Sequence, residues 1–184
     1  MARIIGIAGS LRKGSYNAAL LRAAAERAPA GMEVEIASIA GIPLYDGDLE
    51  SEEGIPDPVT VLKDKIAAAD GLLLVTPEYN NSLPGVLKNA IDWLTRPAKD
   101  IPRVFGDKPV AIMGATPGGG GTRLAQTAWL PVLRTLGTRA WFGKQLYVAG
   151  AAQVFDAEGR LVDEKVKKLL SELMAGFAAF VNVK

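Results

Sequence analysis

The chain has 184 residues, a net charge of +1 and a hydrophobic fraction of 49%, so we expect one domain, residues 1–184, with a sizeable core. It lacks cysteine and histidine, which excludes disulfides, thiolate catalysis, Ser-His-Asp chemistry and Cys or His metal sites; we expect no metal. The near-neutral charge, the absence of a long apolar run and a strand at the very N-terminus predict a cytoplasmic protein without nucleic-acid or membrane partners.

The first predicted element is a buried strand over the apolar run 3–9, followed by a polar turn and a helix over 15–28. The turn therefore lies at a helix N-terminus, where unpaired N–H groups and the helix dipole favour an anion such as phosphate. It adds two hydroxyls and two cations: Ser10, Ser15, Arg12 and Lys13. The alternative is an ordinary loop whose serine caps the helix. The turn contains neither the dinucleotide fingerprint nor the Walker A pattern.

The next segments are more polar. Residues 33–37 alternate charged and apolar residues, which predicts an edge strand, and 59–69 predict a helix. Between them we expect a long loop over 40–58, because residues 40–62 contain six acidic residues and no basic one. A solvated loop is one interpretation. A flap or partner contact is the other, since apolar residues stand among the acids: Leu44, Tyr45 and Leu49.

Two further buried strands are predicted over 71–76 and 108–116. The first runs into Pro77-Glu78-Tyr79-Asn80-Asn81-Ser82 and then a helix with Pro84 in its first turn. By itself this segment is also typical of an ordinary turn in which Asn80 and Asn81 tolerate unusual φ. The second strand runs into Pro117 and four glycines.

The last third of the chain begins with a helix over 122–136, in which Pro131 predicts a kink or break near 127–131. A last strand lies between 137 and 149, with 139–142 and 145–148 as alternative cores. The closing helix carries an apolar stripe typical of core packing: Val162, Val166, Leu169, Leu170, Leu173, Phe177 and Phe180.

The βα unit repeats about five times, which predicts an α/β fold: a three-layer αβα sandwich with a five-stranded parallel sheet. Loops 10–17, 77–82 and 116–122 leave carboxyl ends of strands, where such sheets bind ligands. With strand order 2-1-3-4-5, the first and third strands flank one crevice. A phosphate site in one loop and glycines that let a flat ring approach in another describe a mononucleotide such as FMN.

Three segments resemble the NADPH-dependent FMN reductases, the flavodoxin-like family that includes chromate- and quinone-reducing flavoproteins. They are Gly9-Ser10-Leu11-Arg12-Lys13-Gly14-Ser15-Tyr16-Asn17, Pro77-Glu78-Tyr79-Asn80 and Leu83-Pro84-Gly85-Val86-Leu87-Lys88-Asn89-Ala90-Ile91-Asp92-Trp93. The resemblance implies a flavodoxin-like fold, FMN as cofactor and NADPH or NADH as hydride donor.

The resemblance also implies a set of cofactor-binding residues. The FMN phosphate would be held in the first loop, which also includes Tyr16, by Ser10, Arg12, Ser15 and Asn17. The isoalloxazine would be lined, largely through backbone groups, by Pro77, Glu78, Tyr79 and Asn80. Along the ribityl chain and ring would lie Thr116, Gly118, Gly119 and Gly120. The four-glycine run departs from the family's more varied third loop.

The implied reaction is ping-pong: NAD(P)H passes a hydride to flavin N5, and a quinone, flavin or similar acceptor then takes the electrons. No catalytic side chain is needed, because the cofactor carries the chemistry. The family implies a homodimer or homotetramer. One alternative is a flavodoxin-like electron carrier that binds FMN without oxidising NAD(P)H, although the near-neutral charge argues against it. Another is a phosphate-binding α/β domain without flavin.

Overall fold

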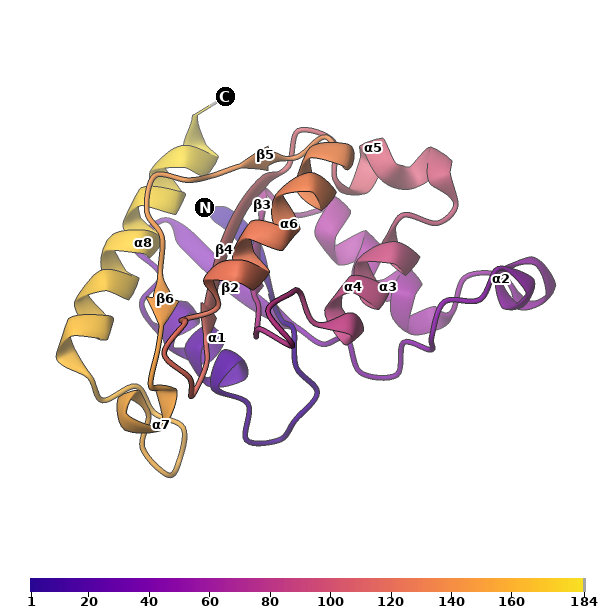
Figure 1. The fold of residues 1–184 in the computed structure, drawn as a ribbon. Helices are drawn as coiled ribbons and strands as arrows, with labels where there is room; N and C mark the ends of the chain where they lie inside the picture. The colour runs from indigo at the N-terminus through magenta and orange to yellow at the C-terminus, as the bar shows by residue number, and fades with distance from the viewer. Residues whose placement is uncertain (184) are drawn as a thin grey trace.

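A computed structural model describes residues 1–183 as a parallel sheet between two layers of helices (Figure 1). The strands lie in the order β2-β1-β3-β4-β5, as predicted, and each pair is parallel. A sixth short strand, β6, also pairs with β4. The strands are β1 (Ala2–Ala8), β2 (Met32–Ala37), β3 (Gly71–Val75), β4 (Pro109–Ala115), β5 (Arg139–Ala140) and β6 (Tyr147–Val148).

Helices cover both faces of the sheet, which confirms the three-layer arrangement (Figure 1). One face packs against α1 (Tyr16–Glu26) and α8 (Glu164–Asn182). The other packs against α3 (Asp57–Ala67), α4 (Gly85–Leu94) and α6 (Arg123–Thr135). The remaining helices are short: α2 (Gly47–Glu53), η1 (Ala98–Asp100), α5 (Ile101–Val104) and α7 (Ala151–Val154).

The central strands are apolar because the helices bury them on both sides. Every residue of β3 is buried, and Ile4, Ile5 and Ile7 of β1 are fully enclosed. Such strands read as continuous apolar runs instead of alternating patterns. That is why the sequence placed β1 and β3 almost to the residue.

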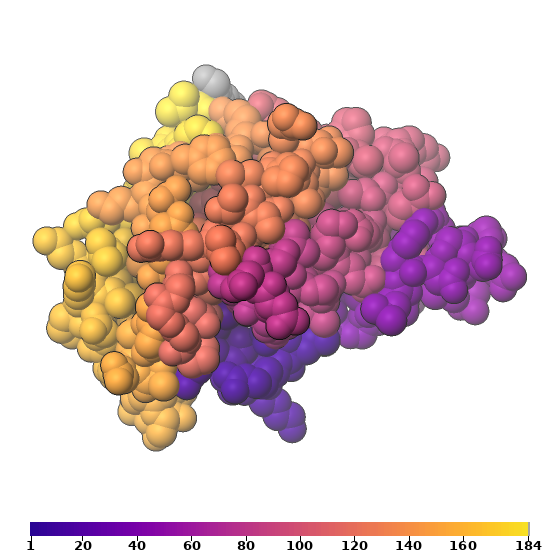
Figure 2. Space-filling view, viewed as in Figure 1, coloured from indigo at the N-terminus to yellow at the C-terminus, as the bar shows by residue number. Residues whose placement is uncertain are grey.

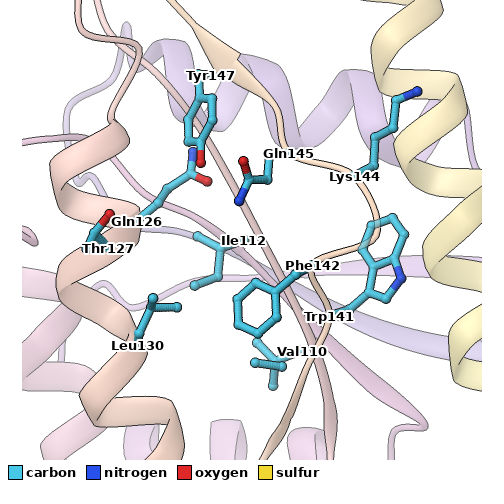
Figure 3. A pocket seen from close by; sticks show the side chains of 11 residues that line it. Val110, Ile112, Gln126, Thr127, Leu130, Trp141, Phe142, Lys144, Gln145 and Tyr147 are labelled. Atoms are coloured by element: carbon cyan, nitrogen blue, oxygen red, sulfur yellow. The ribbon is translucent and has the colours of Figure 1, made fainter.

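The fifth position of the sheet is shared by two strands. β5 pairs with the start of β4, and β6 pairs with its end. Both alternatives for the last strand therefore form, and the expectation of a single fifth strand was wrong. Between them residues 142–145 leave the edge of β4, and a cavity opens there that side chains of this segment, β4 and α6 line (Figure 3).

We expected a continuous loop over residues 40–58. The structure differs, because this acidic segment contains the helix α2. Asp46 caps this helix by accepting from the Asp48 N–H at 2.9 Å, and Gly54 ends it with a φ of 83°. The helix projects from the body of the molecule (Figures 1 and 2). Its base is fastened to α4: Asn89 bonds Tyr45 N and Pro43 O, and the Trp93 indole donates to Pro43 O at 2.9 Å.

The sequence predicted a kink or a break near 127–131, and the structure shows no break there. Helix α6 is continuous across that position, and Pro131 lies on its exposed side. Proline has no N–H to donate to the Thr127 carbonyl, but water can solvate that carbonyl on the exposed side. Pro131 therefore destabilises the helix less than it would on a buried face. Across residues 1–183, the structure contains no helix that is long and apolar enough to cross a membrane.

Candidate functional site

A cleft of about 400 Å³ opens at the carboxyl ends of β1, β3 and β4. This is the edge at which parallel α/β sheets bind ligands. The loops after these three strands meet there on one face of the molecule (Figure 2). Most of the predicted site residues line the cleft: Ser10, Arg12, Ser15, Tyr16, Asn17, Pro77, Glu78, Tyr79 and Thr116.

The structure does not bring every predicted residue into the lining. Asn80 and the glycines Gly118, Gly119 and Gly120 lie in the adjoining loops outside it. Ala115 and Pro117, which were not predicted as site residues, also line the cleft. Pro117 belongs to the loop 116–122 that the sequence placed at the ligand edge, and Ala115 directly precedes that loop.

The first loop is built around the N-terminus of α1. Ser15 caps the helix by accepting from the Ala18 N–H at 3.2 Å, so the capping interpretation is correct for its side chain. Ser10 Oγ accepts from the Arg12 N–H at 3.3 Å. No acidic residue stands in the first turn of α1, so its partial positive charge is not offset there. The capped helix end therefore still favours an anion.

Arg12 adds a full positive charge to this end of the cleft. Its Nη2 donates to the Gly14 carbonyl at 2.6 Å, and its guanidinium lies 5.5 Å from the centre of the Tyr16 ring. The Tyr16 ring in turn stacks on Phe155 at 5.9 Å. These contacts hold the guanidinium at the cleft, and its remaining N–H groups suit a phosphate.

Asn17 is buried, and its side-chain amide bonds both backbone groups of Ala115. The side chain expected to hold phosphate thus also ties α1 to the end of β4.

The second loop contains a tight turn. Tyr79 and Ser82 exchange backbone hydrogen bonds of 3.1 and 3.0 Å, while Asn80 and Asn81 have φ values of 49° and 61°. Positive φ at both central residues is the signature of a type I′ turn, which asparagine tolerates. The turn presents Tyr79 to the cleft, with its hydroxyl 3.5 Å from Ser10 Oγ. The second loop therefore contacts the first across the cleft.

The cavity between β5 and β6 is of a different kind (Figure 3). Its volume is about 70 Å³, room for a few water molecules at about 10–15 Å³ each. Its walls come from α6, β4 and residues 140–147: Val110, Ile112, Gln126, Thr127, Leu130, Ala140, Trp141, Phe142, Lys144, Gln145 and Tyr147. A mononucleotide does not fit there. The cleft is the candidate site because it lies at the carboxyl ends of the strands and most of the predicted site residues line it.

Comparison with known proteins identifies the family. Residues 2–153 match the family model of the NADPH-dependent FMN reductases. The chain belongs to this family. It is 42% identical to an NAD(P)H-dependent FMN reductase of Pseudomonas aeruginosa, over 98% of this chain and 95% of that protein. It is 40% identical to a quinone reductase of Escherichia coli K12, over 98% and 95% of the two chains.

A solved structure agrees with the sequence comparison. The flavoenzyme NAD(P)H:(acceptor) oxidoreductase FerB of Paracoccus denitrificans has a TM-score of 0.87 and 35% identity, covering 98% of this chain and 97% of that one. Family and fold confirm the enzyme class that the resemblance implied, an FMN-dependent NAD(P)H oxidoreductase with a flavodoxin-like fold.

Proposed function

We propose that the cleft binds FMN with the phosphate at α1 and the ring between the second and third loops, and that the enzyme reduces quinones or free flavins. The observation that carries the proposal is the helix end itself. The α1 N-terminus, without an acidic residue in its first turn, faces the same cleft as Arg12. The residues present therefore fit a phosphate monoester at this end.

The opposite end of the cleft fits a flat ring. Pro77 and Tyr79 line it from the second loop, and Thr116 and Pro117 line it from the third. When bound, FMN accepts a hydride from NAD(P)H and passes electrons to an acceptor. The chain's own residues bind and orient it: Arg12 and the α1 amides hold the phosphate, and the loops limit where the ring can lie. No protein acid or base is assigned a proton transfer.

We propose a ping-pong order, in which the nicotinamide leaves before the acceptor enters, because the same bound flavin would serve both half-reactions. Relatives named FMN reductase and quinone reductase support these two acceptor classes. We further propose that residues 1–184 form one domain and that the enzyme acts in the cytoplasm, where NAD(P)H is available as hydride donor.

The experiment is steady-state oxidation of NADPH by the FMN-loaded protein with a benzoquinone, varying both substrates. Parallel double-reciprocal lines are expected for a ping-pong order, and intersecting lines would contradict it. The five acidic residues in and next to α2, Asp46, Asp48, Glu50, Glu52 and Glu53, favour a second candidate, an FMN electron carrier that docks on a basic partner. FMN binding without NADPH or NADH oxidation would support the carrier.

We also propose that the chain forms a homodimer or homotetramer. The proposal rests on the family resemblance. Leu44, which is 82% exposed, is the residue that we propose for the contact, and hydrogen bonds to Asn89 and Trp93 hold its two neighbours in place.

A further inference from the structure

We infer that Glu78 is a positioning residue that fixes the glycine loop, residues 117–121, against the second loop and so sets the ring end of the cleft. The effect of Glu78 on flavin binding rests on the proposed function, whereas its hydrogen bonds are observed in the structure.

The side chain of Glu78 turns away from its own loop and toward α6. Its Oε2 accepts from the backbone N–H groups of Leu124 at 2.9 Å and Ala125 at 3.1 Å. These groups are in the first turn of α6, 46 and 47 positions further along the chain. Because the first N–H groups of a helix lack partners within the helix, a carboxylate there satisfies them and offsets the dipole.

The residue that would ordinarily cap α6 does not do so. Thr122 precedes the helix with a φ of 65°, and among the described residues its side chain forms no capping bond to α6. Its Oγ1 instead accepts from Gln126 Nε2 at 3.1 Å. Glu78 therefore supplies from a distant loop what the local sequence does not.

The glycine loop is held at some points and has few contacts at others. The Gly118 carbonyl accepts from the Gly150 N–H at 3.1 Å, and Gly121 packs closely on Tyr147. Within residues 1–183, however, an added Cβ at Gly119 would meet no atom within 4 Å, so the middle of the loop has little packing to order it. Thr116 anchors one end through backbone bonds to Val148 and Ala151. Glu78 anchors the other through α6, and an added Cβ at Gly120 would lie 3.6 Å from Glu78 Oε1.

This arrangement also explains a carboxylate in a cleft that we propose binds a phosphate. A free carboxylate would repel the ligand's charge. The α6 amides engage Glu78 Oε2 and offset its charge locally, so the residue can link the loops with less repulsion of an anion bound at α1.

The test compares Glu78→Ala and Glu78→Gln with Glu52→Ala, an exposed glutamate on α2 that serves as the control. The first measurement is amide hydrogen exchange at Leu124 and Ala125 by NMR in the flavin-free protein. We expect exchange about fivefold faster in Glu78→Ala, a smaller change in Glu78→Gln, which keeps an acceptor oxygen, and none in the control. Unchanged exchange in Glu78→Ala would overturn the inference.

The second measurement is the dissociation constant of FMN and of riboflavin for each variant, with the absorption spectrum of the bound flavin. FMN and riboflavin share the ring, and we infer that Glu78 acts on the ring end of the cleft. We therefore expect the dissociation constants of both flavins to rise by the same factor in Glu78→Ala, about tenfold, and the absorption spectrum of the bound flavin to shift. Partial recovery in Glu78→Gln would support the inference.

Two outcomes would contradict the link to flavin. Faster exchange with unchanged flavin binding would reduce Glu78 to a helix cap, and weakening of FMN alone would place its effect at the phosphate. If the unsubstituted protein bound neither flavin, the proposed function would fail, and the flavin part of the inference with it. The exchange comparison would still decide whether Glu78 holds the loop.

Discussion

Asn17 holds the backbone of Ala115 at both of its polar groups, across 98 positions of sequence. Asn17 Oδ1 accepts from the Ala115 N–H at 2.9 Å, and Nδ2 donates to its carbonyl at 2.8 Å. Ala115 is the last residue of β4, and Asn17 is in the first turn of α1. The bonds therefore join the loop that we propose binds phosphate to the strand that leads into the glycine loop.

Loss of the two hydrogen bonds between Asn17 and Ala115 should lower the free energy of unfolding. Asn17 is only 4% exposed, so Asn17→Ala would leave two backbone groups of Ala115 without their partner in a buried place. We expect a loss of about 1–3 kcal/mol in the free energy of unfolding. Denaturant unfolding measures it, with Asn182→Ala as control because Asn182 is exposed at the end of α8. Equal values for the two variants would show that the Asn17 bonds contribute nothing net.

The phosphate end of the cleft can be tested separately. Arg12→Ala should weaken FMN about tenfold or more while riboflavin, which lacks the phosphate, binds as before. Lys13→Ala is the matched control, since Lys13 is an adjacent exposed cation that does not line the cleft. Titration of flavin fluorescence gives the dissociation constants of both flavins for the unsubstituted protein and the two variants. Equal weakening of both flavins by Arg12→Ala would mean that Arg12 acts elsewhere than on phosphate.

We expect acid to weaken the ion pair that holds the projecting helix α2. Arg96 donates to Glu50 at 2.7 Å and holds the pKa of that carboxyl below its usual range. A lowered pKa in the folded state means that the pair stabilises the protein above the ordinary glutamate pKa. The contribution disappears as pH falls through the lowered value.

The corresponding measurement is thermal unfolding of the unsubstituted protein and Glu50→Gln from neutral pH into acid. We expect the variant to melt earlier at neutral pH and the difference to vanish in acid, with Glu52→Gln showing no such pattern. A difference that persists or grows in acid would have the wrong sign for this pair.

Leu44, which precedes the projecting helix α2, allows a test of the proposed homodimer or homotetramer. If Leu44 lies in an interface, Leu44→Asp should shift sedimentation toward the monomer, because a carboxylate would have to be desolvated there. Val162→Asp is the control, an exposed apolar residue that precedes α8. A protein that sediments as a monomer without any substitution would contradict the proposed assembly. An oligomer indifferent to Leu44→Asp would exclude this segment as its interface.

Much of the fold follows from local sequence. The apolar runs of β1 and β3 specify strands buried on both faces, and polar or glycine-rich segments after them mark the ligand edge of the sheet. The turn at Asn80 and Asn81 is equally local, since both residues tolerate the positive φ that it requires.

Other features were not predicted. Some depend on tertiary contacts, and one, helix α2, had a local signal in the sequence. Helix α2 had a local signal, Asp46 at its start and Gly54 after its end, that the acidic composition obscured. The sharing of the fifth sheet position by β5 and β6 depends on how residues 142–145 leave β4. The bonds of Asn17 and Glu78 join residues far apart in sequence, so no local pattern could indicate them.

The most direct test of the proposed function is an absorption spectrum of the purified protein, before and after addition of FMN and then NADPH under argon. We predict flavin bands that change on binding, bleach with NADPH and return when a quinone is added. Bands that bleach with neither NADPH nor NADH would contradict the oxidoreductase and favour the carrier. A spectrum in which added FMN behaves as free flavin would contradict the assignment of the cleft.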